Sequence, residues 1–175
     1  MYDGETLIAE AGPATLEMLV PAPVSREEAA ASKGYLGFQR HLFPGGFGCG
    51  PERVEGDGLR IFAGRVRGRD LVAAPWTPDG SLASADGQVR PEFVWAALDD
   101  SGAWSLQSGL EDWQPMVLGR LAAVFLDRVR AGERCVVIGW PMGHEKRKAY
   151  SGTALFGEDG SLCAYARATW VRIRI

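Results

Sequence analysis

The segment from Arg90 to Trp104 constrains the fold of this chain more than any other, because it has the pattern of a helix with almost no polar face. On helical spacing its apolar side chains fall on every stripe, and Pro91 stands in the first turn, where a helix tolerates proline. Such a helix is expected to be buried. Yet Asp99 and Asp100 lie in its middle, and a buried acid is costly unless it is paired, hydrogen-bonded or facing a cavity. This conflict directs the search for function to the two acids.

The composition is that of an ordinary single domain. The chain has 175 residues, enough to bury a real core, and its formal net charge is −3. A general nucleic-acid binder usually has a basic excess. No apolar run approaches the roughly 20 residues that span a bilayer, and residues 1–5 lack the basic and then apolar pattern of a signal peptide. We therefore expect a cytoplasmic protein with neither nucleic acid nor a membrane as partner.

The cysteines and histidines are too scattered to suggest a metal site or a disulfide framework. Cys49, Cys135 and Cys163 lie far apart, and an odd count without a close pair fits a reducing compartment. His41 and His144 have no partner at metal-ligand spacing. The sequence therefore predicts no metal and no bound cofactor.

Residues 1–56 are expected to form an extension that packs on the main domain. A weak alternation predicts a strand at 15–20. Ser25 and Glu28 occupy the two positions of a capping box, which predicts a short helix ending near Gly34. Residues 41–57 are rich in glycine and proline and form a loop of about 17 residues, which is long for a compact domain. Such a loop is either functional or a plain surface connection.

Strand patterns lie on both sides of the central helix. They cover 59–62 and 71–76 before it, and 116–129, 135–140, 149–156 and 162–175 after it. Gly157 to Gly160 is a hairpin turn signal between the last two. The order predicts an α+β domain in which an antiparallel sheet wraps around one long central helix.

Several strings within residues 57–175 carry a resemblance to a known family. Segments 118–133 and 147–169 contain the strings LGRL, FLDRV and GE, and RK, ALFGEDGSL and ARAT. With the order of elements, these resemble the hotdog-fold acyl-CoA thioesterase superfamily, and most of all its phenylacetate-pathway and hydroxybenzoyl-CoA thioesterase branch. The resemblance implies a hotdog domain over 57–175. The string HLFPGGFGCGP at 41–51 also resembles a Cys-x-x-Cys-Gly loop of some actinobacterial relatives, with Gly46 in place of the first cysteine.

The start of the central helix departs from the pattern of that superfamily. Members carry a His-Gly-Gly turn there, with an acid seven residues after the second glycine. In this chain Arg90-Pro91-Glu92 takes the place of the turn, and Asp99 falls on the acid position. The turn of the family offers a backbone N–H that polarises the thioester carbonyl. Pro91 has no N–H, so this role would fall to the amides near Glu92 and Phe93.

The resemblance implies hydrolysis of an acyl-CoA or acyl-carrier-protein thioester, with coenzyme A entering only as part of the substrate. Asp99 is predicted to act as general base or as nucleophile. Glu92 is a second catalytic candidate, although an acid in the first turn usually just stabilises the helix dipole. Asp100 points elsewhere and is expected to make a structural hydrogen bond. The resemblance also implies a homodimer or a dimer of dimers, with the site between two subunits.

Further residues are predicted to contact the substrate or to be structural. Phe93 and Trp95 either line an acyl tunnel or belong to the core. Ser101 either positions water or is structural. A basic turn at 146–148, or another formed by arginines at 65–69, either meets the phosphates of coenzyme A or is a solvated turn. The predicted substrate-binding residues are Arg90, Phe93, Trp95, Ser101, Arg147 and Lys148.

One alternative comes from a different class of protein. A non-catalytic acyl-binding or CoA-binding module would have the same fold, with Arg90-Pro91-Glu92 replacing the catalytic turn. Hydration of acyl-CoA is not expected, because His41 and His144 both lack the upstream aspartate that hydratases of this fold use. The surroundings of the Asp99 carboxyl distinguish the two hypotheses. A cavity beside it favours an enzyme, whereas hydrogen bonds to its own subunit favour a binder.

Overall fold

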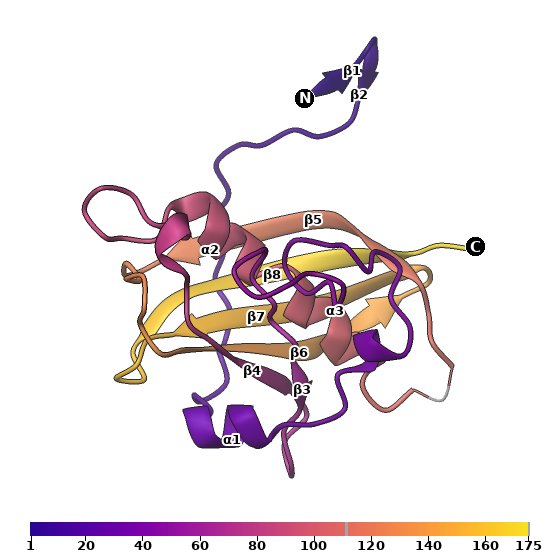
Figure 1. Ribbon diagram of the computed structural model, residues 1–175. Coiled ribbons are helices and arrows are strands. Elements are labelled where there is room, and N and C mark those ends of the chain that lie inside the picture. The colour runs from indigo at the N-terminus through magenta and orange to yellow at the C-terminus, as the bar shows by residue number, and fades with distance from the viewer. Residues whose placement is uncertain (111, 175) are drawn as a thin grey trace.

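An antiparallel sheet of six strands forms the body of the protein in a computed structural model that describes residues 1–110 and 112–174 (Figure 1). The strands lie in the order β3-β4-β6-β7-β8-β5. Their bounds are Gly64–Arg65 (β3), Val72–Trp76 (β4), Met116–Phe125 (β5), Cys135–Glu145 (β6), Lys148–Phe156 (β7) and Leu162–Arg172 (β8). Every neighbouring pair is antiparallel. The predicted α+β class, with a sheet around a central helix, is confirmed.

The strand predictions are confirmed for the long strands and wrong at their ends. The strand predicted at 116–129 stops at Phe125, because the amides of Leu126 and Asp127 both turn to the carbonyl of Cys163. The strand predicted at 135–140 continues to Glu145, and the next begins directly after a turn at 146–147. The last strand ends at Arg172, and Ile175 lies outside the described residues.

The strand predicted at 59–62 is wrong. The amides of Leu59 and Ile61 donate to the carbonyls of Phe47 and Gly48, at 2.8 and 2.9 Å. The stretch therefore pairs with the long glycine-rich loop and does not enter the sheet. Leu59 and Ile61 are both buried, so their apolar character reflects core packing under that loop.

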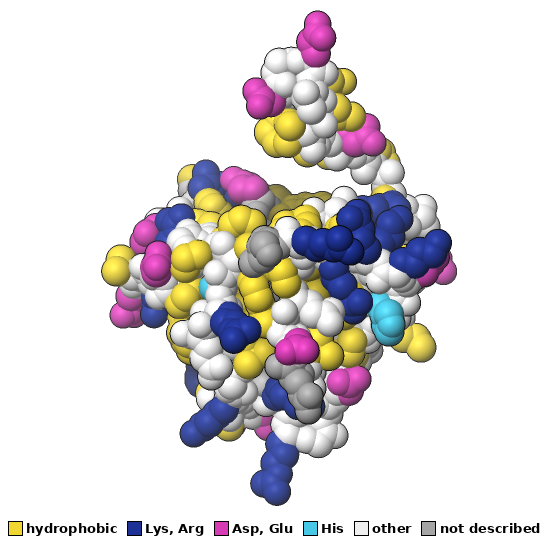
Figure 2. All heavy atoms as spheres, turned by 90° about the vertical axis from the view of Figure 1, so that its right-hand side faces the viewer, with side chains coloured by type: hydrophobic (Ala, Val, Ile, Leu, Met, Phe, Trp, Pro, Cys, Tyr) yellow, Lys and Arg dark blue, Asp and Glu magenta, His cyan; other side chains and the backbone are white. Residues whose placement is uncertain are grey.

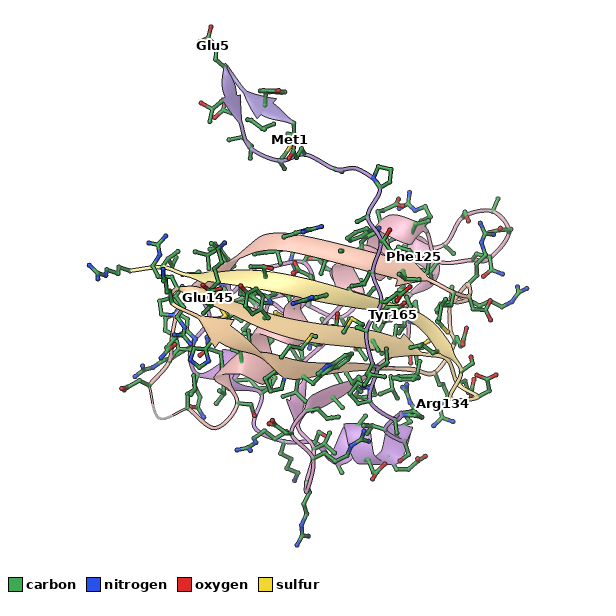
Figure 3. The ribbon with its side chains drawn as sticks, turned by 180° about the vertical axis from the view of Figure 1, so that it is seen from behind. Met1, Glu5, Phe125, Arg134, Glu145 and Tyr165 are labelled. Atoms are coloured by element: carbon green, nitrogen blue, oxygen red, sulfur yellow. The ribbon has the colours of Figure 1, made fainter. Side chains whose placement is uncertain are left out.

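The strand predicted at 15–20 is wrong as well. This stretch runs across the outer face of the sheet, where its carbonyl at Leu16 accepts a hydrogen bond from the Tyr165 hydroxyl at 3.2 Å (Figure 3). A chain that crosses the face of a sheet cannot join its ladder, because the ladder is open only at an edge. Met18 and Val20 pack there on a cluster that includes Trp140.

Short elements complete the N-terminal region. The hairpin of β1 (Tyr2–Asp3) and β2 (Thr6–Leu7) stands clear of the body, beyond β5 (Figures 1 and 3). Helix α1 (Arg26–Ala31) has the predicted capping box, with reciprocal bonds between Ser25 and Glu28. The 3-10 turns are η1 (Leu36–Phe38) and η2 (Gly80–Leu82). No helix in the described part of the chain is long and apolar enough to cross a membrane.

The central helix is present but broken in its middle, which the sequence did not predict. Helix α2 (Pro91–Ala97) and helix α3 (Asp100–Gln107) meet at Leu98 and Asp99. The Thr153 hydroxyl of β7 donates to the carbonyl of Leu98 at 2.7 Å. A side chain that takes a helical carbonyl in this way is a recognised cause of a kink. The break places Asp99 at a corner of the chain, outside the regular helix.

Close packing against β6 fixes the position of α3. A Cβ on Gly139 would collide with the backbone of Ser101, so the glycine lets the helix lie directly on the sheet. Leu98 is fully buried in the main cluster between the helix and the sheet. The sheet therefore fixes the position of the helix, and with it the position of the two acids on the opposite side.

Candidate functional site

The two acids at the helix break are half-buried, and they differ in their hydrogen bonds. Oδ1 of Asp99 is buried and has no hydrogen-bond partner among the described residues. Burial, and then the charge of neighbouring Asp100, raise the pKa of Asp99 to about 7. Burial also raises the pKa of Asp100, against a hydrogen bond from the Cys49 thiol that lowers it. Two adjacent carboxyls in an apolar place cannot both ionise easily, so the pair titrates as one coupled unit.

A cavity of about 140 Å³ opens beside the acids. Asp99, Asp100 and Trp104 form its wall on the helix side, and His41 and Cys49 form the wall opposite. Most of the remaining wall is apolar, from Met116 and Val117 of β5, Trp170 of β8 and Trp113. An apolar cavity of this size holds a group as large as benzene. The Asp99 carboxyl thus faces a space that can take a small acyl group.

The long loop at 41–57 covers this side of the helix, so it is part of the site and not a plain surface connection. The indole Nε1–H of Trp104 donates to the Cys49 sulfur at 3.3 Å, and His41 Nε2 lies 3.3 Å from the same sulfur. The Tyr35 hydroxyl donates to the Cys49 carbonyl at 2.6 Å. Burial holds the pKa of the Cys49 thiol well above its usual range, so the sulfur is a neutral thiol at pH 7.

Sequence reasoning missed the loop residues of the site. The sequence offers no second metal ligand at the right spacing for His41 or Cys49, and the contact between Cys49 and Trp104 joins positions 55 residues apart. The available signal was the unusual length of the glycine-rich loop. Within residues 1–110 and 112–174, no cluster of three or more metal-ligating side chains is found.

The start of α2 presents the replaced turn to solvent. The Glu92 side chain is 61% exposed and lies 3.4 Å from the Arg90 guanidinium, so its charge points away from the helix end. Arg90 also stacks over the ring of Phe93, 4.6 Å from its centre. The amide of Phe93 donates to the carbonyl of Arg90 at 3.0 Å. The amide of Glu92 is therefore the first-turn donor best placed to meet a ligand.

The other predicted contact residues do not gather at the cavity. Trp95 is partly exposed and lies beside Phe125 of β5, with ring centres 5.9 Å apart. Ser101 is buried on the sheet-facing side, close to Gly139, and its hydroxyl has no partner within the described part of the chain. Phe93 packs on Phe47 of the loop, at 5.8 Å between ring centres.

The basic turn at 146–148 lies at the same end of the sheet as the cavity. Strand pairing sets Ala149 opposite the cavity residue Trp170, and the amide of Arg172 donates to the carbonyl of Arg147 at 2.9 Å. Arg147 and Lys148 are exposed, and Figure 2 shows Lys and Arg side chains gathered beside a hydrophobic area on this face. The arginine turn at 65–69 is partly committed elsewhere, because Arg69 binds carbonyls at 22–23.

The fold defined by these elements is the hotdog fold, an antiparallel sheet wrapped around a central helix, as the sequence predicted. The solved structures with this arrangement include the PaaI protein of the Escherichia coli phenylacetic acid degradation operon, with TM-score 0.58 and 14% identity over 66% of this chain and 81% of that one. A putative thioesterase from Ralstonia eutropha, described as related to phenylacetic acid degradation, has TM-score 0.57 and 23% identity over 65% and 85% of the two chains. The protein smu.793 of Streptococcus mutans, solved bound to acetyl CoA, has TM-score 0.53 and 13% identity over 60% and 82%. At these identities the likeness establishes the fold, and neither a protein-family profile nor a curated protein matches the sequence.

Proposed function

We propose that the protein hydrolyses a small acyl thioester with Asp99 as the catalytic acid–base group. The observation that carries this proposal is the Asp99 carboxyl, which faces a cavity and whose buried Oδ1 has no partner among the described residues. The surroundings that raise its pKa to about 7 also suit a base that works near neutral pH. An unpaired acid of this kind destabilises the fold, so its presence is better explained by chemistry than by structure.

The reaction follows from the charge on Asp99. As a carboxylate it takes a proton from water, the resulting hydroxide attacks the thioester carbonyl carbon, and the carbon–sulfur bond breaks. The protonated Asp99 returns its proton to the departing thiolate and is a carboxylate again, and the products are a carboxylic acid and a free thiol. In a second version the carboxylate attacks the carbonyl directly, and water then cleaves the mixed anhydride. Both versions need a hydrogen-bond donor for the developing oxyanion.

One protomer does not supply both the base and that donor. The Glu92 amide and Asp99 are seven positions apart, about 10 Å along a helix at 1.5 Å per residue. A single thioester carbonyl cannot touch both groups at hydrogen-bond distance. We propose that a second copy of the chain brings its own helix start to the cavity, so the working unit is a homodimer or a dimer of dimers.

The edge of the sheet offers a surface for that second copy. Strand β5 has a neighbour, β8, on one side only. Large apolar side chains are exposed along this edge and beside it: Leu118 39%, Phe125 41%, Leu126 58% and Trp95 37%. A long apolar edge strand is an aggregation hazard unless something covers it. Pairing of two β5 strands would cover it and would assign Trp95 to the contact between copies.

Coenzyme A is the proposed carrier of the acyl group. The basic turn with Arg147 and Lys148 lies at the cavity end of the sheet and suits an anionic phosphate group. The Streptococcus mutans protein of the same fold was solved with acetyl CoA, which supports the same class of ligand here. An acyl-carrier protein is the alternative thioester carrier, because it too would present a phosphate and an acidic surface to this basic turn.

A specific observation also keeps the binding module as a second candidate. Pro91 removes one amide from the helix start, and the Phe93 amide is already bonded within the first turn. A site with a weakened oxyanion donor would still bind an acyl group in the cavity. In that case Asp99 would only be a polar group in the wall of the pocket, and the protein would bind the ligand without hydrolysing it.

Thiol release from a panel of short, long and aromatic acyl-CoAs tests the proposal. Asp99→Asn is expected to lose at least about a hundredfold in kcat, the scale of general-base catalysis. Asp70→Asn removes an exposed carboxylate elsewhere and should leave the rate unchanged. Leu118→Arg, which should separate the copies, is expected to lose turnover together with dimerisation in sedimentation. Absence of turnover on every substrate, with acyl-CoA still bound in calorimetry, would overturn the hydrolase and leave the binding module.

A further inference from the structure

Two tryptophans stand in the wall of the cavity beside Asp99. Trp104 comes from α3, one turn after Asp100, and Trp170 comes from β8. They are only 8% and 5% exposed, so nearly the whole of each indole lies inside the protein. The cavity of about 140 Å³ holds a group of about six carbons, because an apolar cavity of this size binds benzene. A larger group can enter only if one of the two rings moves.

Each of the two indoles is held by a hydrogen bond to a buried partner. The Trp104 Nε1–H donates to the Cys49 sulfur at 3.3 Å, and its ring packs on Tyr35 with ring centres 4.8 Å apart. The Trp170 Nε1–H donates to the Ser151 hydroxyl at 2.9 Å, and Ser151 is fully buried. Rotation of either ring would leave a buried N–H without an acceptor, which costs free energy. The cavity therefore has fixed walls and a defined upper size.

The charges around the cavity are unsuited to an acidic acyl group. Among the described residues no Lys or Arg lines it, whereas the carboxyls of Asp99 and Asp100 do. His41 Nδ1 accepts a hydrogen bond from the backbone amide of Phe43 at 3.0 Å, and burial lowers the pKa of this ring, so it is neutral at pH 7. A carboxylate that leaves water needs a cationic partner, and none faces it here. The cavity thus suits an uncharged group.

We propose that Trp104 and Trp170 are the specificity-determining residues of the site, and that they limit it to uncharged, apolar acyl groups of up to about six carbons. The loop at 41–57 takes part in this limit, because its Cys49 sulfur accepts the hydrogen bond that holds one of the two rings. The inference rests on the proposed function for its catalytic meaning. The size of the group that fills the cavity is, however, a property of binding alone.

Binding of thioethers tests the size limit without turnover, because a thioether cannot be hydrolysed. Butyl, hexyl and decyl thioethers of phosphopantetheine, the arm that coenzyme A and acyl-carrier proteins share, are titrated into the full chain in a calorimeter. Up to the hexyl group, each added methylene should raise the affinity about fourfold, the value of its transfer out of water. The decyl thioether should then bind no better than the hexyl one. Equal affinity of all three, or a continued gain through decyl, would overturn the limit.

Substitutions in the wall should move the limit in both directions. Trp104→Phe and Trp170→Phe each enlarge the cavity and should raise the affinity for the decyl thioether at least about tenfold. Trp140→Phe, at an indole that is also 8% exposed but belongs to the cluster on the outer face of the sheet, is the matched control and should change nothing. Ala103→Leu fills the cavity and should weaken hexyl binding at least about tenfold, whereas Ala30→Leu, at an exposed position of α1, should not. The same decyl affinity in all three tryptophan variants would overturn the assignment.

Turnover then separates this inference from the proposed function. The value of kcat/KM should rise from butyryl-CoA to hexanoyl-CoA and fall at least about tenfold at decanoyl-CoA. Succinyl-CoA, which has a terminal carboxylate where butyryl-CoA has a methyl group, should be at least about a hundredfold poorer than butyryl-CoA. If the thioethers show the limit but no thioester is hydrolysed, the specificity stands and the hydrolase fails. If decanoyl-CoA or succinyl-CoA is hydrolysed as well as hexanoyl-CoA, the hydrolase stands and the specificity fails.

Discussion

The two sides of the central helix are built in opposite ways, although they share the same few residues. On the side toward the sheet, Leu98 is fully buried and Gly139 lets the backbone of α3 lie directly on β6. On the side toward the loop at 41–57, two acids face a cavity, and one of their oxygens has no partner in the described part of the chain. The difference shows that packing of the helix against the sheet fixes the position of two acids that have few stabilising contacts of their own.

Loss of packing on the sheet side should have the largest effect on stability. Leu98→Ala removes a fully buried side chain and is expected to lower the free energy of unfolding by about 2–5 kcal/mol. Urea denaturation measures the loss, and Leu110→Ala, at a side chain that is 45% exposed, serves as the control with a change within about 0.5 kcal/mol. A change below about 1 kcal/mol in Leu98→Ala would mean that the helix is not anchored on this side.

On the loop side of the helix, ionisation of Asp99 should destabilise the folded protein, so stability should depend on pH. Asp99 has its pKa raised to about 7 in the folded protein, whereas an unfolded aspartate titrates near 3.9. Between these values the folded state holds a proton that the unfolded state has released. The free energy of unfolding should therefore be highest below about pH 4 as far as this group is concerned, and should fall as the pH rises to about 7.

The expected fall is at most about 4 kcal/mol, from about 1.4 kcal/mol for each of about three units of pKa difference. Denaturation curves at a series of pH values measure it. Asp99→Asn should flatten much of the slope and raise stability at pH 8, where the wild type buries a charge. Asp70→Asn should keep the wild-type slope. A slope that persists unchanged in Asp99→Asn would assign the pH dependence to other groups. Burial of the Asp99 carboxylate would then not destabilise the folded protein.

The sequence predicts the sheet side of this comparison well and the loop side poorly. The buried helix at 90–104 and the long strands after it follow from local patterns, because apolar periodicity reports burial directly. The hotdog fold was implied by the resemblance to the thioesterase superfamily, not by periodicity. The break at Leu98 did not follow, because it depends on a hydroxyl of Thr153, 55 residues away. The same separation in the chain hides the contact between Cys49 and Trp104.

The candidate site was predictable only where it lies on the helix. The conflict between acids and an apolar helix indicates both Asp99 and Asp100, and the resemblance to the thioesterase superfamily singles out Asp99. The structure places Asp99 at the cavity, and its role in catalysis stays a prediction. The pattern had no means to place Trp95 beside Phe125, or Ser101 against the sheet, because periodicity gives burial but not the identity of the neighbour. The strand predicted at 59–62 failed for the same reason, since its apolar residues are buried under a loop.

A smaller effect at Thr153 tests whether the two sides of the helix are coupled. Thr153→Val keeps the shape of the side chain but leaves the buried Leu98 carbonyl without its donor, at an expected cost of about 1–2 kcal/mol in the free energy of unfolding. Thr153→Ser keeps the hydroxyl and controls for the loss of the bond. Because the kink sets the direction of the Asp99 side chain, Thr153→Val should also displace the midpoint of the Asp99 titration. Carbon-13 NMR of labelled aspartate carboxyls measures that midpoint. Should stability fall while the titration of Asp99 stays at its wild-type midpoint, the bond from Thr153 would support the helix without positioning the acid, and the two sides would be independent.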